Sequence, residues 1–149
     1  MRMNIVRLAA VCLGIMAVAC GGATTTHTAN EPPPSTFAEQ VKWGQTLYAD
    51  KCASCHGDSG QGGSAPRVVG LTEGALPLEP PAGATVRKER FVTVADVGTF
   101  VAERMPPGRG GSLTSEEAFA ILAFDLHANG IDLETKLDAA GAKALTIPR

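Results

Sequence analysis

The sequence predicts an all-α domain, because three stretches place apolar residues at helical spacing and no stretch alternates apolar and polar residues as a half-buried strand does. These stretches cover about residues 37–50, 94–104 and 115–128. Between residues 57 and 92 the chain is instead rich in Gly and Pro, which favour turns and loops. We therefore expect three main helices joined by long Gly/Pro-rich loops.

The first predicted helix, residues 37–50, begins after Ser35 or Thr36, whose hydroxyl groups can cap the free N–H groups of a first turn. One face of this helix carries Phe37, Val41, Gly44 and Tyr48. A glycine in the middle of a helix costs about 1 kcal/mol relative to alanine. We therefore expect Gly44 to be there because it lets another helix approach closely.

The other two helices have equally local signals. The helix over residues 94–104 follows Thr93 as its cap, and the last helix begins at a capping box formed by Thr114 and Glu117. Asn129-Gly130 supplies its stop. One strip of the last helix carries Ala118, Ile121, Leu122 and Asp125, with Phe124 beside it. We expect this strip to pack against the first helix.

The N-terminus has the features of a secretory signal peptide. Arg2 and Arg7 precede a charge-free apolar run of twelve residues, from Leu8 to Ala19. A helix that spans the bilayer needs about 20 residues, so this run is too short to span and fits a signal peptide over residues 1–19. We expect an exported protein whose mature chain starts at Cys20.

The end of the signal peptide, Ala-Val-Ala-Cys, resembles a bacterial lipobox, whose cysteine receives a diacylglycerol. Ala17 departs from the usual Leu. An unmodified cysteine at the start of an exported protein would be reactive, so we expect a lipid on Cys20, with ordinary signal-peptidase cleavage as the alternative. Residues 20–36 then form a lipidated N-terminus and a flexible, Pro-rich tether. Gly21 rather than Asp after the cysteine favours the outer membrane over the inner membrane, on the periplasmic side.

We expect one globular domain over residues 37–130 and an extension over residues 131–149 that packs on the domain or trails from it. Two of the 13 Lys and Arg residues lie in the signal peptide, whereas all 15 Asp and Glu residues follow it. The exported chain is therefore acidic, which argues against nucleic acid as a partner. We expect this domain to be a monomer.

The motif Cys-Ala-Ser-Cys-His at residues 52–56 carries the chemistry of the domain. A structural zinc site needs four ligands, and outside the motif the exported chain has only two further histidines. A thioredoxin-like cysteine pair requires a βαβ setting, and no strand is predicted. The remaining interpretation is covalent attachment of a c-type haem, with Cys52 and Cys55 as thioethers and His56 as an axial ligand of the iron.

Met105 is the candidate for the second axial ligand. The other three methionines lie in the signal peptide, so Met105 is the only methionine of the exported chain. It stands at a predicted helix end before Pro106 and Pro107, which stop the helix and stiffen the following loop. A thioether ligand stabilises ferrous iron. His127 is the rival ligand, although we expect it to be exposed on the last helix.

Together these features resemble a class I monohaem c-type cytochrome over residues 40–130. The stretches that carry the resemblance are GQTLYADKCASCHG, APRVVG, RMPPG and LTSEEAFAILAF. The resemblance implies a cytochrome c fold around one covalent haem c, with Gly44 and Tyr48 in contact with the turn that contains Phe124. It also implies that the backbone carbonyl of Pro66 accepts a hydrogen bond from His56 and orients it.

These features predict a one-electron carrier rather than an enzyme, because two bound axial ligands leave no open position for a substrate. The stretch LAFDLHANGIDL is similar to cytochrome c domains that accept electrons from periplasmic dehydrogenases, including quinoprotein and sulfite-oxidising types. We expect electrons to come from such a dehydrogenase or another respiratory donor. They would pass to a terminal oxidase or reductase through transient contacts of less than about 1,200 Å².

Two alternative functions stay open. A dedicated cytochrome subunit of a quinoprotein or sulfite-type dehydrogenase would co-purify with its catalytic subunit. A ligand-binding or peroxidatic haem protein, in which Met105 is displaced, would bind carbon monoxide. Residues 87–109 also contain five basic and three acidic side chains beside Met105, and these form either a docking rim for a redox partner or scattered solvated charges.

Overall fold

The computed structural model describes residues 32–148, so the predicted signal peptide and Cys20 lie outside it. The described chain is helical and has no strand, only an isolated antiparallel bridge between Thr93 and Thr146. The predicted all-α class is therefore confirmed. The helices are α1 (Phe37–Lys51), α2 (Ala53–His56), the 3-10 helix η1 (Leu71–Glu73), α3 (Val94–Arg104), α4 (Ser115–Ala128) and α5 (Ala139–Ala144).

The three predicted helices are α1, α3 and α4, and each begins at a threonine cap. The caps are Thr36, Thr93 and Thr114. In each, the acidic side chain three residues further on accepts a hydrogen bond from the threonine N–H, at 3.2 Å in α1, 2.7 Å in α3 and 2.8 Å in α4. No helix in the described range is long and apolar enough to cross a membrane.

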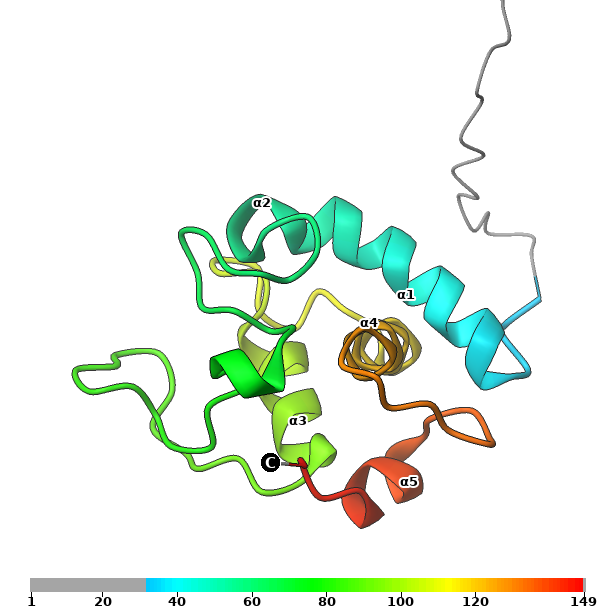
Figure 1. Ribbon diagram of the computed structural model, residues 1–149. Helices are drawn as coiled ribbons and strands as arrows, with labels where there is room; N and C mark the ends of the chain where they lie inside the picture. Colours follow the sequence, from blue (N-terminus) through cyan, green and yellow to red (C-terminus); the bar gives the residue numbers. More distant parts are fainter. Residues whose placement is uncertain (1–31, 149) are drawn as a thin grey trace, which may run out of the picture.

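Helices α1 and α4 cross at a close contact that the sequence predicts (Figure 1). A Cβ atom placed on Gly44 would lie 1.8 Å from the backbone oxygen of Ala120, so only glycine lets the two backbones approach this far. One turn further along α1, the rings of Tyr48 and Phe124 lie 5.0 Å apart between centroids. The crossing fixes the C-terminal end of α1, from which the cysteine motif continues.

The segment after α4 returns to the domain and completes its core. Leu137 and Ile147 are buried in the same apolar cluster as Phe37 of α1. The buried side chain of Gln40 accepts from the N–H of Leu137 at 2.8 Å and donates to its carbonyl at 2.9 Å. The short helix α5 in this segment was not predicted, because its sequence AAGAKA has no apolar periodicity.

The Gly/Pro-rich chain between α2 and α3 has little regular structure but is held by a buried arginine. Arg87 donates hydrogen bonds to the carbonyls of Leu78 at 3.1 Å, Pro77 at 2.9 Å and Glu79. Its guanidinium lies 4.0 Å from the centre of the Phe91 ring, a favourable cation–π distance. Arg87 is therefore a structural residue, and counting it among the surface charges beside Met105 was wrong.

Candidate functional site

The cysteine motif forms the end of one helix and the whole of the next. Cys52 closes α1, and the four residues of α2 end in His56. Neither Cys52 nor Cys55 is in a disulfide, and both thiols are half-buried. A single turn of helix thus presents two free sulfurs and an imidazole in immediate succession.

The imidazole of His56 is oriented by a backbone carbonyl. Its Nδ1 lies 2.6 Å from the carbonyl oxygen of Pro66. Because a carbonyl only accepts hydrogen bonds, Nδ1 carries the proton in this contact. The other ring nitrogen, Nε2, then has a free lone pair, which is the arrangement found in histidines that bind a metal.

Backbone hydrogen bonds fold the loop after α2 back onto the motif, and we call residues 52–70 the attachment segment. Gly62 N–H donates to the His56 carbonyl at 2.7 Å, and Ala65 N–H donates to the Cys55 carbonyl at 3.0 Å. A Cβ on Gly63 would lie only 2.8 Å from the Cys55 oxygen. The glycines of this loop therefore let it turn closely enough to bring the Pro66 carbonyl to His56.

Two side chains from distant helices tie the attachment segment to the rest of the fold. The Tyr48 hydroxyl of α1 donates to the Gly57 carbonyl at 2.9 Å. Asn129, at the end of α4, donates to the Val68 carbonyl at 3.0 Å and accepts from the Gly70 N–H at 2.8 Å. The sequence showed Asn129 only as a helix stop, because a capping asparagine carries no local mark of a contact about 60 positions away.

The environment of the motif argues against two of the three interpretations of Cys-x-x-Cys-His. Burial, followed by the nearby Asp125, raises the pKa of the Cys52 thiol to about 11, which argues against Cys52 as the reactive thiol of a redox pair, because such a thiol has a lowered pKa. Within residues 32–148 no three His, Cys, Asp or Glu side chains are arranged to hold a metal ion, so the ligands for a structural zinc site are not assembled.

Met105 and His127, the two candidates for the second axial ligand, lie in different environments. Met105 caps the C-terminal end of α3, with its N–H bonded to the Val101 carbonyl at 3.0 Å, and its side chain is half-buried. His127 lies on the outer side of α4, where its Nδ1 is 2.6 Å from the Asp132 carboxylate and about half of its side chain is exposed. The structure thus places Met105 half-buried at the end of α3 and His127 on the surface of α4.

The apolar side chains around the motif suit an apolar cofactor. Cys52, Val68 and Leu113 come from separate segments, are only partly buried, and pack against the cluster of Tyr48 and Ile121. An apolar group bound between these segments would remove their remaining surface from water, which stabilises the folded chain. Two free thiols, an imidazole with a free nitrogen and this apolar surround are together the donor set and environment that a covalent haem requires.

Three comparisons with known proteins agree with this geometry. The family model described as cytochrome c oxidase, cbb3-type, subunit III, matches residues 39–124. The thiosulfate dehydrogenase of Stutzerimonas stutzeri (strain A1501) is 33% identical over 100 residues, which are 63% of this chain and 29% of that protein. The thiosulfate dehydrogenase of Psychrobacter arcticus is 33% identical over 87 residues, which are 56% of this chain and 24% of that protein.

A solved structure shares the fold. A chain in the crystal structure of the sulfane dehydrogenase SoxCD from Paracoccus pantotrophus superposes with a TM-score of 0.50 at 28% identity, over 70% of this chain and 51% of that chain. The chain spans less than a third of the length of the two thiosulfate dehydrogenases. Since the family match covers more than half of the chain, the chain belongs to the cytochrome c family described as cytochrome c oxidase, cbb3-type, subunit III, and its cofactor is a covalent haem c.

Proposed function

We propose that this cytochrome c domain carries single electrons away from an exported dehydrogenase that oxidises a sulfur compound. In this proposal Cys52 and Cys55 are the thioether residues, and His56 and Met105 are the axial ligands. When bound, the haem supplies an iron that gains and loses one electron. The observation that carries the proposal is the His56 ring, whose Nδ1 is held 2.6 Å from the Pro66 carbonyl and whose Nε2 is left for the iron.

The chain's own residues give this site its electron-transfer character. The Pro66 carbonyl keeps His56 in one tautomer and one orientation, which raises the basicity of the ligating nitrogen. The apolar side chains of Val68 and Leu113 limit access of water and lower the local dielectric, both of which set the redox potential of a bound haem. We propose that the domain itself is not catalytic, because two axial ligands leave no open position on the iron for a substrate.

The names of the relatives support a sulfur-compound dehydrogenase as electron donor. Two are thiosulfate dehydrogenases and one is a sulfane dehydrogenase. All three are longer than the region they share with this chain. A dehydrogenase on another polypeptide would therefore supply the electrons, and a terminal oxidase or reductase would receive them.

We further propose that the protein is exported and held in the periplasm by a lipid on Cys20, at the outer rather than the inner membrane. The support comes from the sequence: the short apolar run of residues 8–19 and the lipobox-like Ala-Val-Ala-Cys. The described chain adds one observation, that Pro34, two residues before the N-cap of α1, is buried. In this proposal the tether meets the domain at Pro34, and residues 20–33 connect a monomeric domain to the lipid on Cys20.

Deleting the gene in its host tests the proposed donor. We expect thiosulfate-dependent oxygen uptake of the cells to fall, because the electrons lose their carrier, while succinate-dependent uptake stays unchanged as the control. Complementation with the wild-type gene should restore the uptake. Unchanged thiosulfate-dependent uptake in the deletion strain would contradict the proposal. Reduction of the purified ferric protein by thiosulfate alone, with repeated turnover, would show that the domain is itself a dehydrogenase.

A dedicated cytochrome subunit of a dehydrogenase complex is the second candidate, favoured by the longer relatives that contain a region like this chain. It predicts stable co-purification with a catalytic subunit, whereas a diffusing carrier is recovered alone. A displaceable Met105 has less support, because Gly111 N–H is bonded to the Ala102 carbonyl at 2.8 Å and pins the loop to α3. We expect the ferrous protein not to bind carbon monoxide at neutral pH, as checked by its absorption spectrum.

A further inference from the structure

Asp125 is a buried carboxyl group in the last turn of α4. Only 6% of the residue is exposed, and its Oδ1 has no hydrogen-bond partner within residues 32–148. Moving an ionised carboxylate out of water is costly unless the group is paired or becomes protonated. The electron-transfer role described above makes no use of Asp125. The burial of its carboxyl group without a hydrogen-bond partner for Oδ1 in the described chain therefore needs another explanation.

Asp125 lies between two residues of α4 that contact the attachment segment. Ile121, one turn earlier, packs in one cluster with Ala53 and Cys52. Asn129, one turn later, binds the backbone at the other end of the attachment segment, at 2.8 and 3.0 Å. Residues four apart lie on the same face of a helix. The Asp125 side chain therefore faces the segment that holds the thioether and histidine positions.

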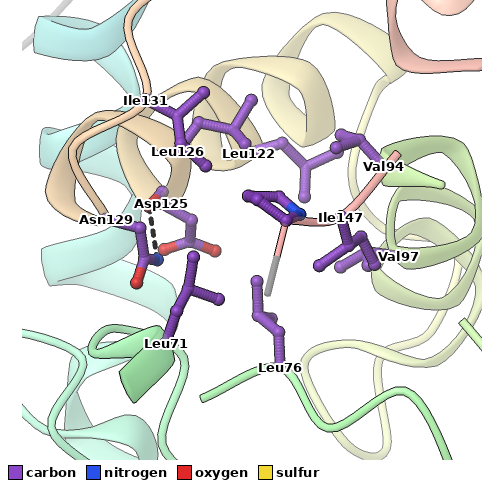
Figure 2. A pocket seen from close by; sticks show the side chains of 11 residues that line it. Leu71, Leu76, Val94, Val97, Leu122, Asp125, Leu126, Asn129, Ile131 and Ile147 are labelled. Atoms are coloured by element: carbon purple, nitrogen blue, oxygen red, sulfur yellow. Dashed lines mark hydrogen bonds between the residues drawn. The ribbon is translucent and has the colours of Figure 1, made fainter. Parts of the chain in front are cut away.

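The carboxyl group points into a small apolar cavity (Figure 2). The cavity volume is about 20 Å³, room for about one water molecule. Its walls are Leu, Val, Ile and Pro side chains from η1, the loop after η1, α3, α4 and the C-terminal segment, and Asp125 and Asn129 are the only polar residues in the described lining. The Asn129 amide already binds the attachment segment and the backbone carbonyl of Asp125. The cavity therefore offers little that could offset the cost of burying the carboxylate charge.

No charged group in the described chain neutralises Asp125. From α1, the titratable groups that interact with it are Tyr48 and Cys52. Both are neutral at pH 7, since Cys52 is an uncharged thioether once the haem is attached and burial raises the pKa of Tyr48 above its usual value. The residues that α3, η1 and the C-terminal segment present to the cavity are apolar. Burial accordingly raises the pKa of Asp125 to about 8.

We propose that Asp125 is a redox-linked proton site, whose carboxylate takes up one proton from solvent when the protein accepts one electron from its donor. The carboxyl group releases the same proton when the electron leaves. In the pH range where Asp125 is ionised in the oxidised protein and protonated in the reduced protein, one proton enters with the electron and leaves with it, so the net charge is balanced. The proposal rests on haem attachment at Cys52, Cys55 and His56, because it requires that the electron be held near the attachment segment.

The physical reason is the low dielectric between Asp125 and the attachment segment. An added electron there repels the carboxylate charge, and the repulsion is far stronger in an apolar interior than in water. Reduction therefore raises the pKa of Asp125, and deprotonation lowers the reduction potential. If the proton affinity differs tenfold between the two redox states, the potential shifts by about 59 mV across the titration.

Redox titration of the haem-bearing protein from about pH 6 to about pH 10 tests the proposal. We expect the wild-type potential to fall with rising pH and then to level off. Asp125→Asn keeps the shape of the side chain but cannot ionise, and its potential should match that of the wild type at low pH and stay higher at high pH. Glu116→Gln, an exposed change on the same helix, and Arg149→Gln, next in sequence after Pro148, are controls that should keep the wild-type curve.

Three results would overturn the proposal: a wild-type potential that does not vary with pH, an Asp125→Asn protein with the wild-type pH dependence, or loss of that dependence in Arg149→Gln. Should Asp125→Asn fail to fold, Asp125→Leu, which suits the apolar cavity, takes its place with the same expected result. Infrared difference spectra of the wild type provide a second readout, since reduction should produce a protonated-carboxyl C=O band. Haem content and the ligand bands of the visible spectrum, recorded on the same samples, report separately whether the attachment site itself is as proposed.

Discussion

The attachment segment, residues 52–70, and the Met105 segment, residues 105–113, are held in the fold by different means. Side chains from two crossing helices bind the attachment segment: Tyr48 of α1 and Asn129 at the end of α4. The Met105 segment is bonded mainly to itself and to the end of α3, with Gly111 N–H on the Ala102 carbonyl and Arg109 N–H on the Pro106 carbonyl.

The difference indicates how each proposed axial ligand is positioned. The position of His56, which we call the histidine side, depends on the crossing of α1 and α4, because that crossing brings Tyr48 and Asn129 to the same segment. The position of Met105, the methionine side, depends on the end of α3 and a short loop. Changes far from the motif should therefore disturb the histidine side, whereas a change at Met105 should act locally.

The largest effect is expected from removing both cysteines. In the Cys52→Ala, Cys55→Ala double variant the haem is not attached, and the half-buried apolar side chains around the motif stay exposed to water. A domain of this size has little stability to lose, so we expect no cooperative thermal transition in circular dichroism. Cys20→Ala, outside the domain, is the control and should fold normally. A cooperative transition in the haem-free double variant would contradict this prediction.

Gly44→Ala should break the crossing on which the histidine side depends. The new Cβ would lie 1.8 Å from the Ala120 oxygen, so the helices must separate, and we expect a loss of about 3 kcal/mol or more in the free energy of unfolding. Chemical denaturation of the haem-bearing protein measures this loss. Gly98→Ala is the matched control, because its Cβ would meet only the movable Leu122 side chain at 3.1 Å. Equal losses in the two variants would argue against the close approach at Gly44.

Asn129→Ala should weaken the attachment segment without moving the helices. It leaves the Val68 carbonyl and the Gly70 N–H unpaired, and we expect a cost of about 2 kcal/mol. Hydrogen exchange of the Gly70 amide should become faster as well. Asp132→Ala is a control that removes an exposed pair with His127, which is worth about 1 kcal/mol or less. An unchanged Gly70 exchange rate in Asn129→Ala would show that the Asn129 hydrogen bonds are not needed to hold the attachment segment.

Met105→Ala should have the most confined effect. The haem stays attached and the helix content is unchanged, while the reduction potential falls because a soft ligand that favours ferrous iron is lost. His127→Ala is the matched control and should leave the potential unchanged. Redox titration of the two purified variants compares them directly, and a normal potential in Met105→Ala would mean that another residue is the ligand.

The main helices could be predicted from the sequence because their signals are local. Thr36, Thr93 and Thr114 are caps that act within one turn. The contact at Gly44 was also predictable, since an unexplained glycine on a helix face indicates a close neighbour. Helix α5 was missed because short runs of small residues have no periodicity.

Other features depend on contacts that no local pattern reveals. Arg87 looks like any surface arginine until the carbonyls of residues 77–79 surround it. The sequence placed Asp125 on the apolar strip of the last helix. The lack of a hydrogen-bond partner for its Oδ1 among the described residues is evident only in the fold, where η1, α3 and the C-terminal segment surround it. The proposed roles of Cys52, Cys55, His56 and Met105 stay predictions from the motif and its spacing, and the Pro66 contact is the one for which the structure supplies the distance.

The packing of the C-terminal segment shows that the folded unit extends beyond the match to the family model. The match to the family model ends at residue 124, yet Leu137, Ala142 and Ile147 belong to the same core as Phe37 and Val97. A fragment cut at the family boundary would expose this apolar wall to water. Anyone who transplants the domain as an electron-carrying module into another protein should therefore carry the chain through to residue 148.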